Sequence, residues 1–187
     1  MLDGASLGRA VETVAAVREA VGDSADILIE CHGRFSAKSA ARAAETLRPY
    51  GIYFMEGTVH PEDLEGLAKF RSAARVPVAL GERVANKGQL LQYIQYVGYI
   101  QVNLKRFGGP TEARLAATIA ETLGVLTAFH NANGPVLHAT TVQLDAAIPN
   151  FAVQESFYDF CPRCKRELIC DALPVENGHI EVPIRPA

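Results

Sequence analysis

The sequence predicts an α/β fold, an incomplete (β/α)8 TIM barrel of about six βα units. Short apolar runs alternate with amphipathic stretches, which is the pattern of a parallel sheet covered by helices. Polar residues follow every predicted strand instead of gathering at one switch point, which favours part of a barrel over a doubly wound sheet. We expect the partial barrel to occupy residues 1–160 and an irregular C-terminal segment to occupy residues 161–187.

The six predicted strands are apolar runs bounded by polar or turn-forming residues. They occupy residues 27–29, 52–55, 76–80, 99–104, 125–129 and 151–154. Parallel strands are buried on both faces, and they therefore read as continuous apolar runs and not as alternating patterns. We expect all six strands to be parallel.

The stretches between these strands have the periodicity of amphipathic helices. The predicted helices begin near residues 5, 36, 61, 87, 108 and 135. The residues best suited to begin a helix, as N-cap or at the first turn, are Ser36, Asn86 and Pro61. In the helix that begins near residue 108, Leu115, Ile119 and Leu123 share one face.

The composition excludes several classes of protein. With 187 residues, 49% hydrophobic and 21% charged, the chain can bury one sizeable core. A net charge of −3 without a basic stripe argues against nucleic-acid binding. No apolar run approaches the roughly 20 residues of a membrane span, and the first residues do not follow the plan of a signal peptide. We therefore expect a cytoplasmic protein that does not bind membranes.

Four cysteines are too few for a disulfide scaffold in a chain of this length. A zinc-binding interaction module is an alternative function for residues 161–179, with Cys161, Cys164, Cys170 and His179 as the candidate ligands. Zinc sites usually show two spaced pairs of ligands, and the second pair is missing. We interpret this segment as irregular chain with reduced cysteines.

Carboxylates recur at a fixed interval after the predicted strands. Glu30, Glu56 and Glu82 are 26 residues apart, and one strand, helix and pair of loops takes roughly 25 to 30 residues. Equal spacing therefore places each carboxylate at the same point of consecutive units. The polar residues that share the strand-end position are Glu30, His32, Glu56, Glu82, Asn103, His130 and Glu155.

Three converging carboxylates repel one another unless a cation neutralises them. Oxygen ligands suit a hard divalent ion, so we predict a Mg²⁺ site. A metal flanked by histidines suits removal of a proton next to a substrate carboxylate. The metal would hold the developing enediolate, one histidine would take the proton, and another would protonate a leaving hydroxyl.

The ordered set of motifs resembles the barrel of the mandelate racemase and muconate lactonizing enzyme group of the enolase superfamily. The matching motifs are Glu30-Cys31-His32-Gly33-Arg34, Phe54-Met55-Glu56, Gly81-Glu82-Arg83, Gly108-Gly109, His130 and Gln154-Glu155. Within this group the chain is most similar to acid-sugar dehydratases such as galactonate dehydratase. The resemblance implies a Mg²⁺-dependent lyase that removes water from an acid-sugar carboxylate.

The resemblance also implies a role for each residue. Glu30, Glu56 and Glu82 match the three Mg²⁺ ligands. His32 matches the general acid for the departing hydroxyl, and His130 matches the base that takes the α-proton. The remaining carboxylate, Glu155, matches the group that hydrogen-bonds the substrate carboxylate.

Four positions depart from the family pattern. Asn103 stands where the family has an aspartate that orients and charges the histidine, so we expect His130 to be a weak base. Glu30 stands where aspartate is usual. Gly57-Thr58 stands where the second motif normally continues Glu-Pro, so an acidic residue and a rigidifying proline are missing, and we expect a looser loop and weaker metal binding.

The resemblance includes neither the family's N-terminal capping domain nor its first two barrel strands. It implies that the segment 180–183 returns toward that cap. Six strands leave two sheet edges open, so we expect a homo-oligomer or association with a complementary fragment. The alternative function is a non-catalytic remnant or a fragment of a split enolase-superfamily protein.

Overall fold

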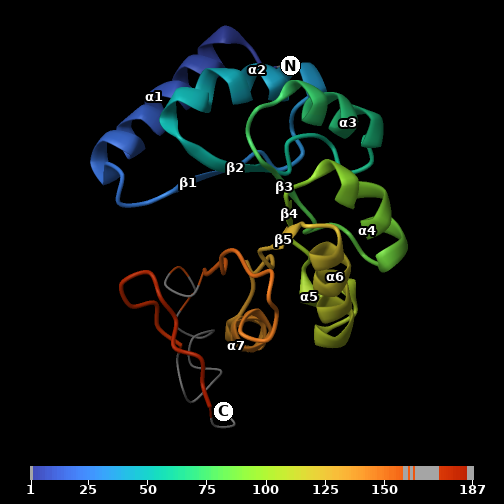
Figure 1. Cartoon of the computed structure of the whole chain (residues 1–187). Coiled ribbons are helices and arrows are strands. Elements are labelled where there is room, and N and C mark those ends of the chain that lie inside the picture. Colours follow the sequence, from blue (N-terminus) through green and yellow to red (C-terminus); the bar gives the residue numbers. More distant parts are fainter. Residues whose placement is uncertain (1, 158–159, 161, 163–172, 185–187) are drawn as a thin grey trace. The chain divides into compact units, whose positions relative to one another are not determined.

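The computed structural model describes residues 2–157, 160, 162 and 173–184 (Figure 1). The chain divides into two compact units. The first comprises Met1–Leu80 and Gln95–Gly98, and the second comprises Gly81–Ile94 and Tyr99–Ala187. Strands are parallel and helices follow them in both units, as the sequence predicts.

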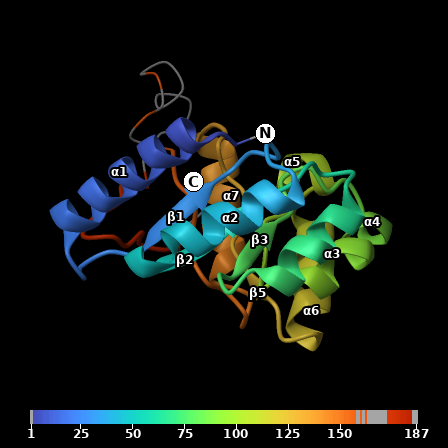
Figure 2. The same cartoon turned by 90° about the horizontal axis from the view of Figure 1, so that it is seen from above.

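The first unit alternates strands with helices. Its elements are α1 (Gly4–Val21), β1 (Ile27–Glu30), α2 (Ala37–Leu47), the 3-10 helix η1 (Arg48–Tyr50), β2 (Ile52–Glu56), α3 (Leu64–Ala73) and β3 (Val78–Leu80). Strand β2 pairs in parallel with both β1 and β3. Helix α2 lies between α1 and α3, as Figures 1 and 2 show.

The core of the first unit lies around its central strand. Phe54 and Met55 from β2 and Leu67 and Phe70 from α3 are at most 2% exposed. Each such side chain contributes roughly 1.5 to 3 kcal/mol of hydrophobic stabilisation when fully buried. Because β2 is mostly buried, packing fixes the position of its last residue, Glu56.

Local side-chain chemistry decides where the helices begin. The predicted N-caps are confirmed at Ser36, which accepts from the Ser39 N–H, and at Asn86, which accepts from the Gln89 N–H. The prediction that Pro61 begins the third helix is wrong, because the Asp63 carboxylate accepts from the Gly66 N–H at 2.8 Å. Asp63 is therefore the N-cap, and α3 begins at the next residue, Leu64.

The second unit has shorter strands and more helix. Its elements are α4 (Lys87–Tyr93), β4 (Tyr99–Ile100), α5 (Leu104–Phe107), α6 (Pro110–Thr122), β5 (Leu126–Thr127) and α7 (Pro135–Asp145). The 3-10 helix η2 (Ile94–Tyr96) follows α4 and crosses the boundary between the units. Strands β4 and β5 are parallel, with Tyr99 opposite Leu126.

Four predicted strands are shorter than expected: the strands predicted over 76–80 and 125–129 are Val78–Leu80 and Leu126–Thr127, and the other two differ more. The strand predicted over 99–104 ends at Ile100, because Asn103 caps the short helix α5, which the sequence did not reveal. The strand predicted over 151–154 is a single parallel bridge between Phe151 and Thr127. Thr127 accepts from Ala152 at 2.8 Å, and no further ladder follows within the described residues.

Helix α6 buries small side chains. Its buried residues are Ala113, Ala116, Ala117 and Ala120. Alanine has no atoms beyond Cβ, so this face packs closely where α6 contacts α5, β5 and α7. Leu115 and Leu123, which share the face noted in the sequence, are 43% and 56% exposed.

In the part of the chain that the structure describes, no helix is both long enough and apolar enough to cross a bilayer.

We predict that Asn150→Ala lowers the free energy of unfolding by about 2 to 4 kcal/mol. The buried Asn150 amide donates to the carbonyls of Ala117 and Val125 and to Thr127 Oγ1, at 2.9 to 3.1 Å. Alanine leaves these acceptors buried without their donor. Urea unfolding measures the loss, and a loss below 1 kcal/mol would contradict this role for Asn150.

Candidate functional site

Two carboxylates lie side by side in the first unit. Glu30 and Glu56 are the last residues of β1 and β2 and are partners in the strand register. The Cys31 N–H continues the pairing by donating to the Glu56 carbonyl at 3.0 Å. Glu56 is 9% exposed, whereas the Glu30 side chain is 44% exposed. Two like charges on adjacent strands, one of them buried, favour a cation at this strand end.

His32 is held against Glu30 by a turn of the backbone. Its φ of 55° lies in the left-handed region, which is uncommon for a residue with a side chain. In this conformation the His32 N–H donates to Glu30 Oε1, and the imidazole Nδ1 lies 3.7 Å from the same oxygen. The unusual backbone therefore fixes an imidazole beside a carboxylate, as is common at functional sites.

The loop after β2 is held firmly at Gly57. The Gly57 N–H donates to the Ala79 carbonyl at 3.1 Å, and its carbonyl accepts from Gly33 at 2.5 Å. Thr58, the next residue, is fully buried. The prediction of a looser loop is wrong, because φ at Gly57 is +51° and both of its backbone groups are bonded.

Cys31 follows Glu30 in the chain and is a buried packing residue. Burial, together with the negative charges of Glu30 and Glu56, raises the pKa of the Cys31 thiol to about 12. The thiol therefore keeps its proton at neutral pH and is not a nucleophile.

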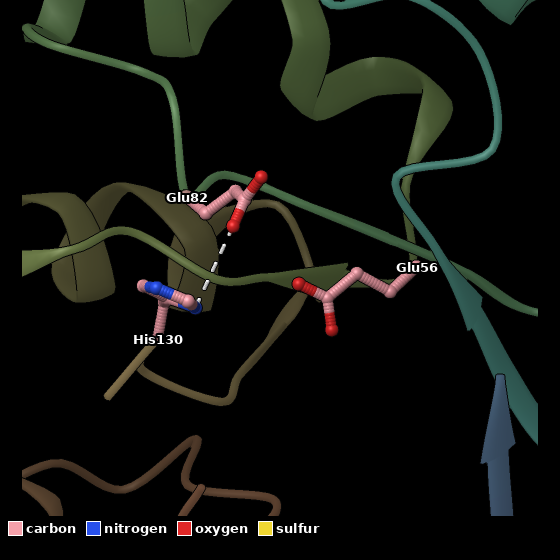
Figure 3. Close-up of side chains that lie close together, drawn as sticks. All are labelled: Glu56, Glu82 and His130. Atoms are coloured by element: carbon pink, nitrogen blue, oxygen red, sulfur yellow. Dashed lines mark ion pairs between the residues drawn. The ribbon is translucent and has the colours of Figure 1, made fainter. Parts of the chain in front are cut away.

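The second unit gathers a histidine and two carboxylates. His130 Nδ1 lies 3.0 Å from Glu155 Oε2 and 3.8 Å from Glu82 Oε2. Figure 3 shows the Glu82 and His130 side chains pointing toward each other. All three side chains are mostly buried, with exposed fractions of 14% to 27%. Arg83 pairs with the other oxygen of Glu82 at 3.1 Å, so this carboxylate has a cationic group on two sides when His130 is protonated.

The backbone positions this cluster through close approach of neighbouring segments. The His130 N–H donates to the Val102 carbonyl at 3.3 Å, which extends the pairing of β4 with β5. A Cβ at Gly81 would lie 2.6 Å from the Gln101 backbone nitrogen. Only glycine lets the chain pass at this distance, and Glu82 follows directly.

Asn103 has a structural role at the start of α5. The Asn103 side chain accepts from the Lys105 N–H at 3.0 Å and caps α5. A carboxylate does contact His130, but it comes from Glu155, 52 positions further along the chain. The sequence could not reveal this contact, because it depends on how the chain folds after the last bridge.

Asn131 is a site residue that the sequence reasoning missed. Its N–H donates to Glu155 Oε2 at 2.6 Å, and its amide donates to the Glu155 carbonyl at 3.3 Å. The same amide lies 3.0 Å from Nδ1 of His138, a buried histidine on α7. Asn131 thus fixes the Glu155 carboxylate beside His130. Its position directly after the strand-end histidine was the available signal.

The zinc alternative falls mostly outside the described residues, because Cys161, Cys164 and Cys170 are not among them. His179 is described, and its Nδ1 lies 2.9 Å from the Asn177 carbonyl. His179 also forms an antiparallel bridge with Glu176. The zinc hypothesis stays a prediction.

The fold and the site define a class of protein with a barrel of the enolase type. The family model described as enolase C-terminal domain-like matches residues 2–186. The chain therefore belongs to this family, and its fold is part of the (β/α)8 barrel of the enolase superfamily. The predicted fold class and the predicted family are both confirmed.

Two relatives identify the branch of the family to which the chain is similar. It is 46% identical over 182 residues to a D-gluconate dehydratase of Thermoproteus tenax, covering 96% of this chain and 37% of the relative. It is 42% identical over 180 residues to a D-gluconate/D-galactonate dehydratase of Picrophilus torridus, covering 95% of this chain and 46% of the relative. The chain spans less than half the length of these relatives.

A solved structure agrees with this assignment. The crystal structure of a mandelate racemase/muconate lactonizing enzyme from Jannaschia sp. CCS1 superposes with a TM-score of 0.92 at 30% identity. The match covers 98% of this chain and 47% of that one.

Proposed function

We propose that this chain provides the metal-binding and proton-transfer residues of a Mg²⁺-dependent acid-sugar dehydratase. One observation carries the proposal. A mostly buried imidazole, His130, contacts the carboxylates of Glu82 and Glu155 in a chain that is similar over 96% of its length to a D-gluconate dehydratase. A histidine in contact with carboxylates is suited to accept a proton and to carry the resulting charge.

The proposed metal ligands are Glu30, Glu56 and Glu82. The donor set fits Mg²⁺, because carboxylate oxygens are its preferred protein ligands. Within the first unit, Glu30 and Glu56 are register partners of the same charge, and Glu56 is buried. When bound, the ion would supply positive charge to the substrate carboxylate and so favour ionisation of the neighbouring C–H bond.

The two histidines have complementary proposed roles. His130 takes the proton from the carbon next to the substrate carboxylate, and the carboxylates of Glu82 and Glu155 favour the imidazolium that forms. His32 donates a proton to the hydroxyl on the adjacent carbon as its C–O bond breaks. The products are water and an enol that has lost one water relative to the substrate. Ionised Glu155 favours the imidazolium, and the hydrogen bond to the substrate carboxylate is assigned to Glu155 in its protonated form, which has an O–H to donate.

The substrate class follows from the relatives that act on D-gluconate and D-galactonate. We propose a linear acid sugar as substrate, a cytoplasmic location, and self-association or pairing with a complementary fragment. Sedimentation over a range of concentrations tests the last point, because a complex dissociates on dilution.

A non-catalytic remnant is the second candidate. Asn103 favours it, because an amide does not supply the negative charge that stabilises an imidazolium. The contact of Glu155 with His130 favours the enzyme. A substrate screen separates the two.

We expect His130→Asn to lower the dehydration rate of the preferred acid sugar by at least about 10²-fold, because the variant has no base for the α-proton. A screen of acid sugars with added Mg²⁺, followed by detection of the keto product, measures the rate. His60→Asn is the matched control, since His60 lies in a loop and its Nδ1 accepts from the Glu62 N–H.

The same screen includes Asn103→Asp, which keeps the helix cap and adds a carboxylate. A gain of activity that His130→Asn abolishes supports the family dyad. If neither the parent nor Asn103→Asp converts any acid sugar while both bind Mg²⁺, the remnant is the correct reading.

A further inference from the structure

We propose that Gly57 is a positioning residue for Glu30, because its missing side chain leaves the space that the Glu30 carboxylate occupies. The inference rests on the proposed function, in which Glu30 is a metal ligand. It adds a residue that neither binds the metal nor touches the substrate. Its role is to leave room for the Glu30 carboxylate to occupy one position at the end of β1.

The space beside Gly57 is too small for a side chain. A Cβ built on Gly57 would lie 3.1 Å from Glu30 Oε1 and 3.4 Å from the His32 backbone nitrogen. Ordinary van der Waals contact begins at 3.4 Å, so a methyl group requires the Glu30 carboxylate to move by a few tenths of an ångström.

The backbone of Gly57 cannot move away to make room. Its N–H is bonded to Ala79 on β3 and its carbonyl to Gly33, so the residue is tied to segments on both sides of it. Glu30 Oε1, in turn, accepts from the His32 N–H. A side chain at position 57 therefore shifts the carboxylate relative to the hydrogen bond that positions it.

Gly57 also has a positive φ, and this second effect must be separated from the first. Alanine in the left-handed region costs about 1 kcal/mol whether or not the site is crowded. Gly22 offers the matched control, because its φ is +55° and nothing lies within 4 Å of its built Cβ. Gly22→Ala carries the conformational cost without the steric one.

The experiment measures Mg²⁺ affinity by calorimetry for the parent, Gly57→Ala, Glu30→Asp, the double variant and Gly22→Ala. We expect Gly57→Ala to weaken binding by about 10- to 100-fold, as is typical when a neighbour of a metal ligand is changed. Aspartate withdraws the carboxylate by one methylene. We therefore expect Gly57→Ala to weaken binding by less than about threefold in the Glu30→Asp background, and Gly22→Ala to leave the affinity unchanged.

Two further variants distinguish failure of this inference from failure of the proposed function. If Glu30→Gln and Glu56→Gln weaken Mg²⁺ binding while Gly57→Ala does not, the metal site stands and the role of Gly57 is wrong. If neither glutamine variant alters binding, the proposed metal ligands are wrong.

Folding is followed for each variant by circular dichroism and urea unfolding. If Gly57→Ala fails to fold but the double variant folds, the steric account is supported. If both fail to fold, the positive φ alone explains the glycine and the inference is overturned.

Discussion

Asp145→Asn will stabilise the protein at alkaline pH, by an amount that grows as the pH rises. Asp145 is the last residue of α7 and is 7% exposed. Among the described residues, neither of its carboxyl oxygens has a hydrogen-bond partner. Burial raises the pKa of Asp145 from 3.8 to about 8, so ionising this carboxyl opposes folding.

The direction of the pH dependence follows from linkage. The pKa in the folded protein lies above the unfolded value of 3.8, so the folded state binds more protons between these values. The contribution of the protonated Asp145 carboxyl to the free energy of unfolding is fully present below about pH 4. It is lost as the pH rises through about 8. The loss is on the order of 5 kcal/mol above pH 8, which is a large part of the stability of a typical domain.

Urea unfolding at pH 5, 7 and 9 tests this prediction. The buried asparagine amide has its own cost, which does not change with pH, so the informative quantity is the difference between variant and parent as the pH changes. We expect that difference to grow by roughly 4 kcal/mol from pH 5 to pH 9. Asp23→Asn, at an exposed position, is the control and should follow the parent. Parallel curves for parent and Asp145→Asn would refute the prediction.

Glu155→Gln will lower the rate of acid-sugar dehydration by about two to four orders of magnitude, given that the proposed function holds. Glu155 Oε2 lies 3.0 Å from His130 Nδ1 and accepts from the Asn131 N–H. Glutamine keeps the size of the side chain but removes the charge that favours an imidazolium. It also removes the carboxylate assigned to the substrate.

Steady-state kinetics and thermal unfolding together test the role of Glu155. We expect kcat to fall while the melting temperature changes by only a few degrees. Glu65→Gln, which removes an exposed charge on α3, should leave kcat unchanged. A Glu155→Gln enzyme with more than half of the parent's kcat would show that another group supports His130.

Features that depend on local sequence could be predicted, and those that depend on distant contacts could not. The N-caps at Ser36 and Asn86 and the strands that end at Glu30 and Glu56 follow from neighbouring residues. The contact between His130 and Glu155 joins segments 25 residues apart, so no local pattern contains it.

The outcome at Gly57 has a similar explanation. The loss of a rigidifying proline from the Gly57-Thr58 pair suggested a freer loop, because proline restricts the backbone and glycine does not. In the folded protein the positive φ of Gly57 aligns both backbone groups with partners on neighbouring segments. The freedom of glycine is used here to reach one conformation that other residues rarely adopt.

The alanine face of α6 has a consequence for how this helix tolerates substitution. Ala113, Ala116, Ala117 and Ala120 are at most 1% exposed, so a larger side chain at any of them would have to separate packed elements. Leu115 and Leu123 on the outer face have room for polar residues of many sizes. Sequence drift along α6 should therefore spare the small residues and alter the large apolar ones, the reverse of the order that hydrophobicity alone suggests.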